Sequence, residues 1–365
     1  MENKGQHRKL TLYIIGLCFV CGLLGVVAGC LLLGGVEKRV EQRLTNLEAA
    51  VAETKAERPL TGVEIYELSQ TQTVGIQTDY TTTNLFGIST PDAVSGTGFV
   101  IREDGYILTN YHIVEKAILH DGEISVLFPD GDRSPARVSG FEASLDLAVL
   151  KLDKTGLTAV DLGDSSALRV GDRVYTEGNN LGELAFTQTT GTISGLDRFV
   201  IATIGGEQVP LCVFQLDAAI NSGSSGGPVY NERGEVVGIV TAKYAASGVE
   251  GLGFAMPIND VMKAAQELIL NGYIAGMTDL GAQIADAQQG VSRASVSYVV
   301  PGGCADRAGL LVGDAITAID GRRVSVQSEL EAVIKTYRIG DTAELTVDRD
   351  GETVRVEVVF DNAEG

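Results

Sequence analysis

The stretch Asp217-Ala-Ala-Ile-Asn-Ser-Gly-Ser-Ser-Gly-Gly-Pro228 decides how the rest of the chain is interpreted. It follows an apolar run, Val209 to Leu216, and precedes a strand-like segment, Glu235 to Ala242. Glycines beside a serine let the backbone turn sharply and expose N–H groups that can hold an oxyanion, while a neighbouring base can activate the hydroxyl. On this interpretation Ser225 is a nucleophile. Taken alone, the stretch is more typical of a Gly/Ser loop, so a base and an acid must be found elsewhere.

Two residues elsewhere in the chain suit the roles of base and acid. Of the three histidines, one is in the N-terminal tail and His120 precedes an Asp-Gly turn, whereas His112 directly follows an apolar strand-like run. The acid that orients such a base should be buried on or beside a strand, and Asp146 opens the apolar run 147–152. Each residue alone is also compatible with a structural role. In the order His112, Asp146, Ser225, the three match the arrangement of chymotrypsin and differ from subtilisin and the α/β-hydrolases.

Length and composition describe a globular protein of more than one domain. With 365 residues the chain is long enough for two domains, and 45 glycines fit a protein of short strands and many turns. A formal charge of −20 argues against a nucleic-acid partner, because few basic groups are available to neutralise phosphates. The five cysteines show neither a disulfide framework nor the spacing of a metal site, so we predict no structural disulfide, no metal and no cofactor.

An apolar segment near the N-terminus predicts attachment to a membrane. Residues 11–36 carry no charge, and as a helix they would extend for about 39 Å, enough to cross a hydrocarbon core of ~30 Å. The short basic stretch before them favours export, which places the rest of the chain on the extracytoplasmic side of a bacterial cell membrane. Val27-Ala-Gly-Cys30 also resembles a lipobox, so a transmembrane helix and a lipid anchor at Cys30 both remain open. The charged stretch 37–58 is compatible with a short coiled coil or a solvated stalk, and 59–70 with a linker.

Beyond residue 70 the pattern changes to short apolar and β-branched runs separated by Gly, Asp and Asn, which is typical of a sandwich or a barrel. Pro257 to Leu270 has the apolar spacing of a helix. A second unit begins near Thr278. It alternates strands with a short helix around 304–308 and a longer one over 327–337.

Three motifs resemble the catalytic motifs of the HtrA (Deg) serine proteases, namely Thr109 to Val114, Leu145 to Leu152 and Asp217 to Pro228. Gly251 to Pro257 resembles the family segment that closes the protease domain and lines its substrate pocket, and Val300 to Gly321 resembles part of a PDZ domain. The resemblance implies a mainly-β chain in which a chymotrypsin-like double β-barrel precedes a small α+β PDZ domain. The apolar N-terminal segment adds a transmembrane helix to this fold.

The resemblance covers roughly residues 72–362 and sets the expected domain organisation. In chain order we expect a short tail (1–10), a transmembrane helix or lipoprotein-type signal (11–36), a stalk or linker (37–70), a trypsin-like protease domain (71–262), a linker helix and loop (263–277) and a PDZ domain (278–362). The family also implies a homotrimer, and loops near 183–187, 196–208 and 243–250 that switch the site on.

The resemblance assigns roles to particular residues. It gives a catalytic triad of His112, Asp146 and Ser225, an oxyanion hole of backbone N–H groups from Gly223, Ser224 and Ser225, and a substrate pocket of Ala219, Ile220, Asn221, Leu252, Gly253 and Phe254. Ser224 stands where the family usually has Asn, and Ser222, Tyr111 and 178–180 also depart from the common pattern without removing a catalytic group. Ala219 stands where trypsin relatives specific for basic residues carry an acid, so aliphatic side chains are the expected preference at the cleaved bond.

The PDZ-like unit is expected to bind C-terminal peptides by strand addition. The resemblance gives Leu280, Gly281, Ala282 and Ile284 as its binding residues. A Leu-Gly-Ala segment that serves only for packing is the alternative, because Asp279 does not match the usual aromatic or apolar residue at its position.

The expected function is that of a membrane-tethered serine endopeptidase, regulated by its PDZ domain, that cleaves misfolded or unfolded exported proteins in protein quality control. Two alternatives remain open. One is a signalling protease with a dedicated membrane-protein substrate, and the other is a PDZ chaperone or scaffold whose triad is inactive.

Overall fold

The computed structural model describes residues 58–83, 87–180, 184–243, 251–276, 278–286 and 293–361. The description below concerns the unit Leu60–Gly365. The predicted membrane segment, the lipobox at Cys30 and the coiled-coil stretch lie outside the described residues. Within the described ranges no helix is both long and apolar enough to cross a bilayer.

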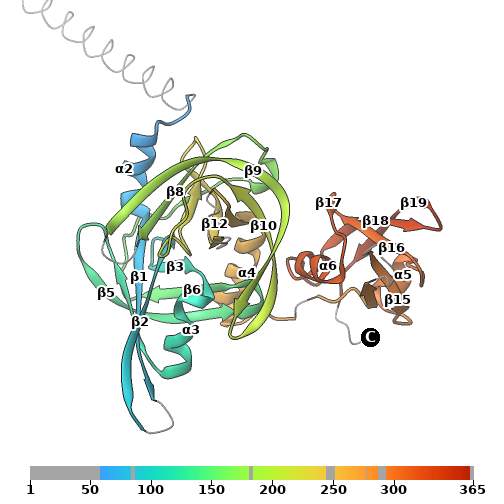
Figure 1. Cartoon of the computed structure of the whole chain (residues 1–365), viewed down its shortest axis with the longest axis horizontal. Coiled ribbons are helices and arrows are strands. Elements are labelled where there is room, and N and C mark those ends of the chain that lie inside the picture. The colour runs from blue at the N-terminus through green and yellow to red at the C-terminus, as the bar shows by residue number, and fades with distance from the viewer. Residues whose placement is uncertain are drawn as a thin grey trace, which may run out of the picture. The chain divides into compact units, whose positions relative to one another are not determined.

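A closed six-stranded barrel forms the first part of the predicted protease domain (Figure 1), with its strands paired in the order β1-β2-β3-β6-β5-β4. Their bounds are β1 Thr73–Thr83, β2 Ser89–Arg102, β3 Tyr106–Thr109, β4 Glu123–Leu127, β5 Arg133–Glu142 and β6 Leu147–Leu152. Strand β6 is buried at five of its six positions, as an uninterrupted apolar run predicts. Helix α3, Tyr111–His120, follows β3, and the 3₁₀ helix η1, Ala143–Leu145, precedes β6. These two connections carry the predicted base and acid.

The second barrel is built from strands that follow in sequence. They are β8 Arg173–Asn180, β9 Leu184–Ile204, β10 Glu207–Leu216, β11 Pro228–Tyr230, β12 Glu235–Lys243 and β13 Gly253–Pro257. The order is β11-β8-β9-β10-β13-β12, and pairing of β11 with β12 closes the ring. The short strand β7, Asp161–Leu162, adds to β12, and the 3₁₀ helix η2, Ser165–Ala167, follows it. The stretch around Ser225 lies between β10 and β11. The prediction of a double β-barrel is therefore confirmed.

The loops expected to switch the site are only partly described. Residues 184–187 and 196–204 belong to the long strand β9, which turns at Gly205-Gly206 into β10. The predicted loop 196–208 is therefore mainly a β-hairpin, whereas residues 244–250 lie outside the described residues.

Residues 59–70 contain most of a helix where a linker was predicted. Helix α2, Gly62–Gln72, begins with a capping box in which the side chains of Thr61 and Glu64 each accept a hydrogen bond from the backbone N–H of the other residue. Ile65 on this helix is fully buried in the core of the protease domain. The folded domain therefore begins before the predicted boundary at residue 71.

Helix α4, Ile258–Asn271, closes the protease domain. Its buried face contains Val261, Ala264, Ala265 and Leu268, which belong to the same core as the first barrel. The predicted boundary between residues 262 and 263 cuts through this continuous helix. Both halves pack on the barrel, so neither half is a linker.

The PDZ domain has its own sheet and core. Its elements are β14 Ala282–Asp286, β15 Ala294–Val299, α5 Cys304–Ala308, β16 Ala315–Ile319, β17 Arg322–Arg323, α6 Gln327–Ile334, β18 Thr342–Arg349 and β19 Glu352–Val359. The sheet order is β14-β15-β16-β18-β19, with β17 paired to β16, so β14 is an edge strand. Burial along β18 alternates in its first half, because one face of the strand packs on the core. The longer helix ends at Ile334, three residues before the predicted end.

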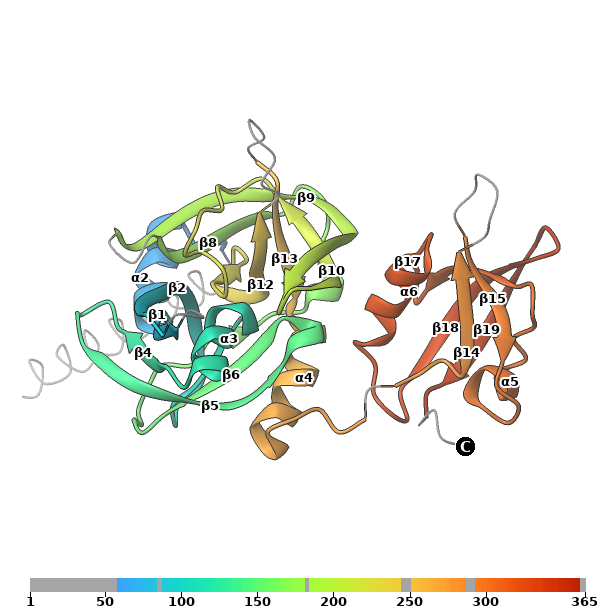
Figure 2. The same ribbon diagram turned by 60° about the horizontal axis from the view of Figure 1, so that its bottom comes forward.

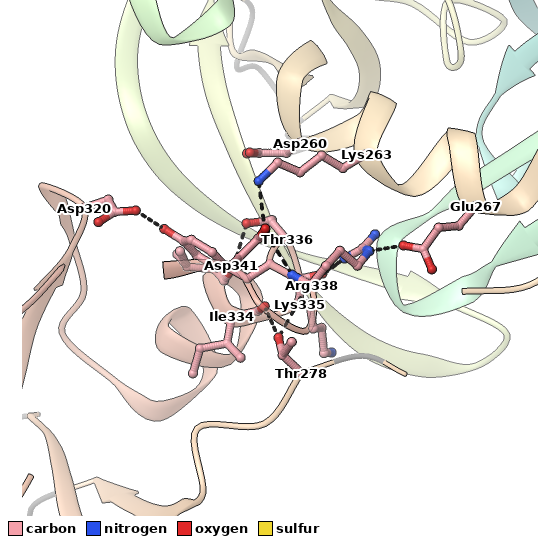
Figure 3. A network of polar contacts seen from close by, with 12 residues as sticks. Asp260, Lys263, Glu267, Thr278, Asp320, Ile334, Lys335, Thr336, Arg338 and Asp341 are labelled. Atoms are coloured by element: carbon pink, nitrogen blue, oxygen red, sulfur yellow. Dashed lines mark hydrogen bonds and ion pairs between the residues drawn. The ribbon is translucent and has the colours of Figure 1, made fainter. Parts of the chain in front are cut away.

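Polar side chains of α4 contact the PDZ domain (Figure 3). Three ion pairs form this contact. Figure 3 shows Arg338 with Glu267 and Lys263 with Asp341, the latter at 3.2 Å. The third pair joins Arg322 to Asp260 at 2.7 Å. The side chains of Arg338 and Glu267 are only 15% and 22% exposed. Solvent therefore screens this pair less than it screens a pair on an open surface.

Candidate active site

His112 lies in the first turn of α3, just after β3. Its backbone N–H donates a hydrogen bond of 3.0 Å to Oδ1 of Asp146. Its ring Nδ1 lies 3.0 Å from Oδ1 and 2.9 Å from Oδ2 of the same carboxylate. The structure thus brings together two of the predicted triad residues. A carboxylate on Nδ1 favours the tautomer in which Nε2 can accept a proton.

Asp146 is fixed on several sides. It follows η1 with a left-handed backbone, φ 50°, and is 1% exposed. The Thr241 hydroxyl donates to its Oδ2 at 2.8 Å, and Nδ2 of Asn110 donates to its backbone oxygen at 3.0 Å. Because Thr241 lies on β12, the acid from the first barrel is held by a residue of the second.

The surroundings of His112 favour its protonated form. Burial lowers the pKa of His112, but the charge of Asp146, their hydrogen bond and the charge of Glu115 outweigh it and raise the pKa above its ordinary value of 6.5. Glu115 lies one turn further along α3, is 7% exposed, and its Oε1 has no hydrogen-bond partner among the described residues. A ring that binds a proton readily suits a general base that must take one from a hydroxyl.

Thr97 of β2 holds the loop that carries Ser225. Its N–H donates to the Ser225 carbonyl at 2.9 Å, and its hydroxyl donates to the Gly223 carbonyl at 2.5 Å. The Thr97 carbonyl in turn accepts a hydrogen bond of 2.7 Å from the Thr109 hydroxyl. A Cβ atom at Gly226 would lie 2.1 Å from that carbonyl, and its φ is +82°, so only glycine fits. The first barrel therefore positions the nucleophile loop of the second.

The loop leaves two of the three predicted oxyanion donors available. Ser224 donates its N–H to the Asn221 carbonyl at 3.0 Å, which commits this donor to a turn within the loop. The Ser224 N–H is therefore not available as an oxyanion donor, in contrast to the prediction. In the described part of the chain, the N–H groups of Gly223 and Ser225 and the Ser225 hydroxyl have no hydrogen-bond partner. Catalytic hydrogen bonds are often absent or long until substrate binds, so this geometry is compatible with a nucleophile.

The second barrel brings together the two segments that are predicted to line the substrate pocket. Leu216 at the end of β10 pairs with Gly253 at the start of β13, and a Cβ atom on Gly253 would lie 2.6 Å from Cγ1 of Ile220. The acid nearest in sequence, Asp217, accepts two hydrogen bonds from Thr192, at 2.5 and 3.1 Å. Both oxygens of the Asp217 carboxylate are therefore bound by Thr192 of β9.

Strand β14 and helix α6 lie side by side in the PDZ domain (Figure 2). Residues of both elements line a groove of about 460 Å³. Three of the predicted binding residues line it, and they face apolar residues of α6: Leu280, Ala282 and Ile284 on one side, Leu330 and Ile334 on the other. Gly281, the fourth, does not line the groove. Its N–H donates to Oδ1 of Asp279 at 2.7 Å.

Two residues that hold the site escaped the sequence analysis. The Thr97–Gly223 hydrogen bond joins residues 126 positions apart, and the Thr241–Asp146 hydrogen bond joins residues 95 positions apart. A single hydroxyl residue in the apolar run 236–242 was the only signal for Thr241. Thr97 lies between two glycines, a pattern shared with many turns.

This fold and site define a trypsin-like serine protease that carries a PDZ domain. Residues 96–239 match the trypsin-like peptidase domain family, a range that contains His112, Asp146 and Ser225. Residues 278–359 match the PDZ domain family.

The chain belongs to the HtrA family of serine proteases. The "Serine protease Do-like HtrA" of Bacillus subtilis is 35% identical over 308 residues, which covers 77% of this chain and 68% of that protein. The "Probable periplasmic serine endoprotease DegP-like" of Chlamydia trachomatis is 36% identical over 276 residues; 73% of this chain is covered, but only 54% of that longer relative. The solved structure of the HtrA-type protease AlgW with a decapeptide has a TM-score of 0.58 and 27% identity, covering 82% of this chain and 98% of that one.

Proposed function

We propose that this protein is a membrane-tethered serine endopeptidase that cleaves misfolded or unfolded exported proteins. The observation that carries the proposal is the double contact of His112 with the buried Asp146, beside a loop that presents Ser225. His112 takes the Ser225 proton as the hydroxyl attacks a peptide carbonyl, and it later protonates the leaving amine. Asp146 holds the ring in the required tautomer and stabilises the imidazolium.

The oxyanion of the tetrahedral intermediate is proposed to bind the N–H groups of Gly223 and Ser225. Loss of one such donor typically costs about 2.7–4 kcal/mol of transition-state stabilisation. The Thr97 hydroxyl accordingly acts as a positioning group, because it fixes the Gly223 carbonyl and with it the peptide plane next to the first donor.

We propose that the enzyme cleaves the peptide bonds that come directly after aliphatic residues. Ala219 contributes no charge to the pocket, and Asp217 is engaged by Thr192. A lysine or arginine side chain would therefore lose water without gaining a carboxylate. Mass-spectrometric mapping of cuts in an unfolded substrate measures this preference, and a majority of cuts after Lys or Arg would refute it.

The location and assembly are proposals that rest on the sequence and on the family. The apolar segment 11–36 would tether the protease to the cell membrane, and the description of the Chlamydia relative as periplasmic supports an extracytoplasmic position. A homotrimer of protease domains is proposed from the family alone. Crosslinking of the detergent-solubilised chain would test it.

The PDZ domain is proposed to bind peptides and to regulate the protease. Its groove has the apolar lining that strand addition requires, and the AlgW structure contains a decapeptide. The ion pairs between α4 and the PDZ domain offer a physical route from the groove to the protease core.

Labelling by a fluorophosphonate and digestion of casein by the full chain in detergent test the central proposal. Ser225→Ala should abolish both, whereas Ser222→Ala, at an exposed serine of the same loop, should preserve both. Casein cleavage by the Ser225→Ala variant at the wild-type rate would sink the assignment.

A further inference from the structure

The loop before β14 already holds a carboxylate. When a peptide adds as a strand to an edge such as β14, its C-terminal carboxylate is received by backbone N–H groups of the loop at the end of the groove. In this chain that loop is Asp279-Leu280-Gly281. Oδ1 of Asp279 accepts the Gly281 N–H at 2.7 Å, so the protein's own side chain occupies one of these donors.

Hydrogen bonds from α5 and the turn before it fix the backbone of this loop, so its N–H groups keep their direction. The Leu280 carbonyl accepts the Ala305 N–H at 3.1 Å and the Cys304 thiol at 2.9 Å. The Gly281 carbonyl accepts the Val300 N–H at 2.9 Å. These contacts come from the start of α5 and the turn before it. A ligand carboxylate could therefore accept the Gly281 N–H only by displacing the Asp279 side chain.

Charge at this end of the groove also opposes a ligand carboxylate. The charged residues that line the groove are two acids, Asp279 and Glu331, and one base, Lys335. The Arg307 guanidinium is engaged by Asp361, whose backbone forms a bridge with Asp279. A free C-terminus brought to Gly281 would lie beside the Asp279 carboxylate, and like charges at that distance repel.

We infer that the PDZ groove takes internal, extended apolar segments of unfolded chains and gives no advantage to a free C-terminal carboxylate, with Asp279 as the residue that sets this preference. This inference rests on the proposed peptide-binding function of the groove. Leu280, Ile284, Leu330 and Ile334 line the groove and would receive aliphatic side chains of such a segment. An internal segment continues past the loop as a neutral peptide and creates no like-charge contact.

The test uses the full chain with Ser225→Ala, solubilised in detergent, so that no ligand is cleaved. A fluorescent peptide with apolar C-terminal residues is prepared as the free acid and as the C-terminal amide, and fluorescence anisotropy gives both Kd values. With Asp279 in place, the acid should bind no more tightly than the amide. Asp279→Ala frees the Gly281 N–H and should make the acid bind at least about tenfold tighter than the amide, since a hydrogen bond to a charged group gives a factor of that order.

Three further variants separate the effect of charge from that of geometry, and the groove from the rest of the surface. Asp279→Asn keeps a side-chain oxygen for the Gly281 N–H but removes the charge, so its preference for the acid should lie between those of the other two proteins. Glu352→Ala removes an exposed acid outside the groove and should leave both Kd values unchanged. Ile284→Glu places a charge in the groove and should weaken both peptides. Asp279 is exposed, so its substitutions should not disturb folding.

Failure of this inference and failure of the peptide-binding proposal would give different results. A tenfold or greater preference for the acid with Asp279 present, lost in Ile284→Glu, would overturn the inference while supporting peptide binding by the groove. Absence of binding by either peptide in every variant would overturn both the peptide-binding proposal and the inference that rests on it.

Discussion

Glu177 on β8 is a buried acid whose ionisation should destabilise the folded protein. Its side chain is 1% exposed, and its Oε1 accepts only a long hydrogen bond of 3.4 Å from Gln70 on α2. Its Oε2 has no partner within the described ranges. Burial raises the pKa of Glu177 from 4.5 to about 7, although the neighbouring Ser69 hydroxyl opposes part of the rise. We predict that Glu177→Gln abolishes the resulting pH dependence.

The sign and size of the effect follow from proton binding. In the unfolded chain the Glu177 carboxyl ionises near its ordinary pKa of 4.5, whereas in the folded protein it stays protonated up to about pH 7. The folded state binds more protons in this window, so its stability falls as the pH rises and levels off above it. At about 1.36 kcal/mol per pH unit, the full loss is about 3.4 kcal/mol, of which about 2.5 kcal/mol falls between pH 5 and pH 8.

Thermal unfolding of the full chain in detergent, followed by circular dichroism from pH 5 to 8, measures this loss. Because other groups also titrate, the informative quantity is the difference between Glu177→Gln and the wild type, which should grow by roughly 5–10 °C in melting temperature toward pH 8. Glu207→Gln, at an exposed glutamate, is the matched control and should follow the wild type. A difference in melting temperature between Glu177→Gln and the wild type that stays constant from pH 5 to pH 8 would refute the reasoning.

Three further outcomes can be checked with the same protein. Asp146→Asn should lower kcat/KM on a fluorogenic peptide by about 10⁴-fold, because the imidazole loses its required tautomer; an unchanged rate would remove Asp146 from the triad. Glu115→Gln should move the acid limb of the pH–rate profile to lower pH, since the charge of Glu115 helps to raise the pKa of His112; a limb at the same pH would contradict this. Arg338→Ala should lower the melting temperature more than Arg355→Ala, because the two arginines are 15% and 74% exposed; equal shifts would mean that the α4 contact adds no stability.

The double barrel and the contact between His112 and Asp146 could be predicted because the motifs that carry the family resemblance are short local stretches of sequence. His112 follows an apolar strand, and Asp146 directly precedes the apolar strand β6. Strand runs punctuated by glycine and polar residues indicated a sandwich or a barrel, and the resemblance to the HtrA proteases implied the double barrel. The position of each catalytic motif at the end of a strand then follows from the alternation of strand and turn.

Helix α2 was missed because most of its buried positions are polar. Ile65, Ser69 and Gln72 are buried, so no apolar stripe marks the helix, although Thr61 and Glu64 formed a readable capping box. Burial of Gln72 depends on long-range partners. Its Nε2 donates at 2.9 Å to the backbone carbonyl of Ala159, in the segment that joins β6 to β7, and its Oε1 accepts from the Tyr230 hydroxyl of β11 at 3.3 Å. Such partners are visible only once the barrels are assembled.

The sequence likewise could not show whether the Gly281 N–H is available to a ligand. Asp279 departed from the family pattern, which signalled a difference but not its nature. An aspartate side chain can point to solvent or accept from the backbone N–H two residues on, and the choice depends on how the loop is held. Here the contacts to α5 fix the loop, and the carboxylate takes the second option.

Strand β8 joins the buried acid to the nucleophile loop. Two residues beyond Glu177, the Asn179 N–H donates to Oγ1 of Thr97 at 2.9 Å, and the Thr97 hydroxyl in turn holds the Gly223 carbonyl. A Cβ atom on Gly227 would lie only 2.3 Å from the Glu177 carbonyl, so the backbone of β8 lies directly against the loop. Ionisation of Glu177 should therefore loosen α2 and the loop together.

This coupling has a measurable consequence for catalysis. Deprotonation of His112 raises the rate of both proteins with pH, so the ratio of the wild-type rate to the Glu177→Gln rate isolates the effect of the buried acid. That ratio should fall as the pH passes about 7, where burial places the pKa of Glu177. Peptide hydrolysis measured on both proteins from pH 6 to 9 gives the ratio. A constant ratio, alongside a confirmed difference in stability, would show that α2 is anchored by Glu177 without any influence on the oxyanion donors.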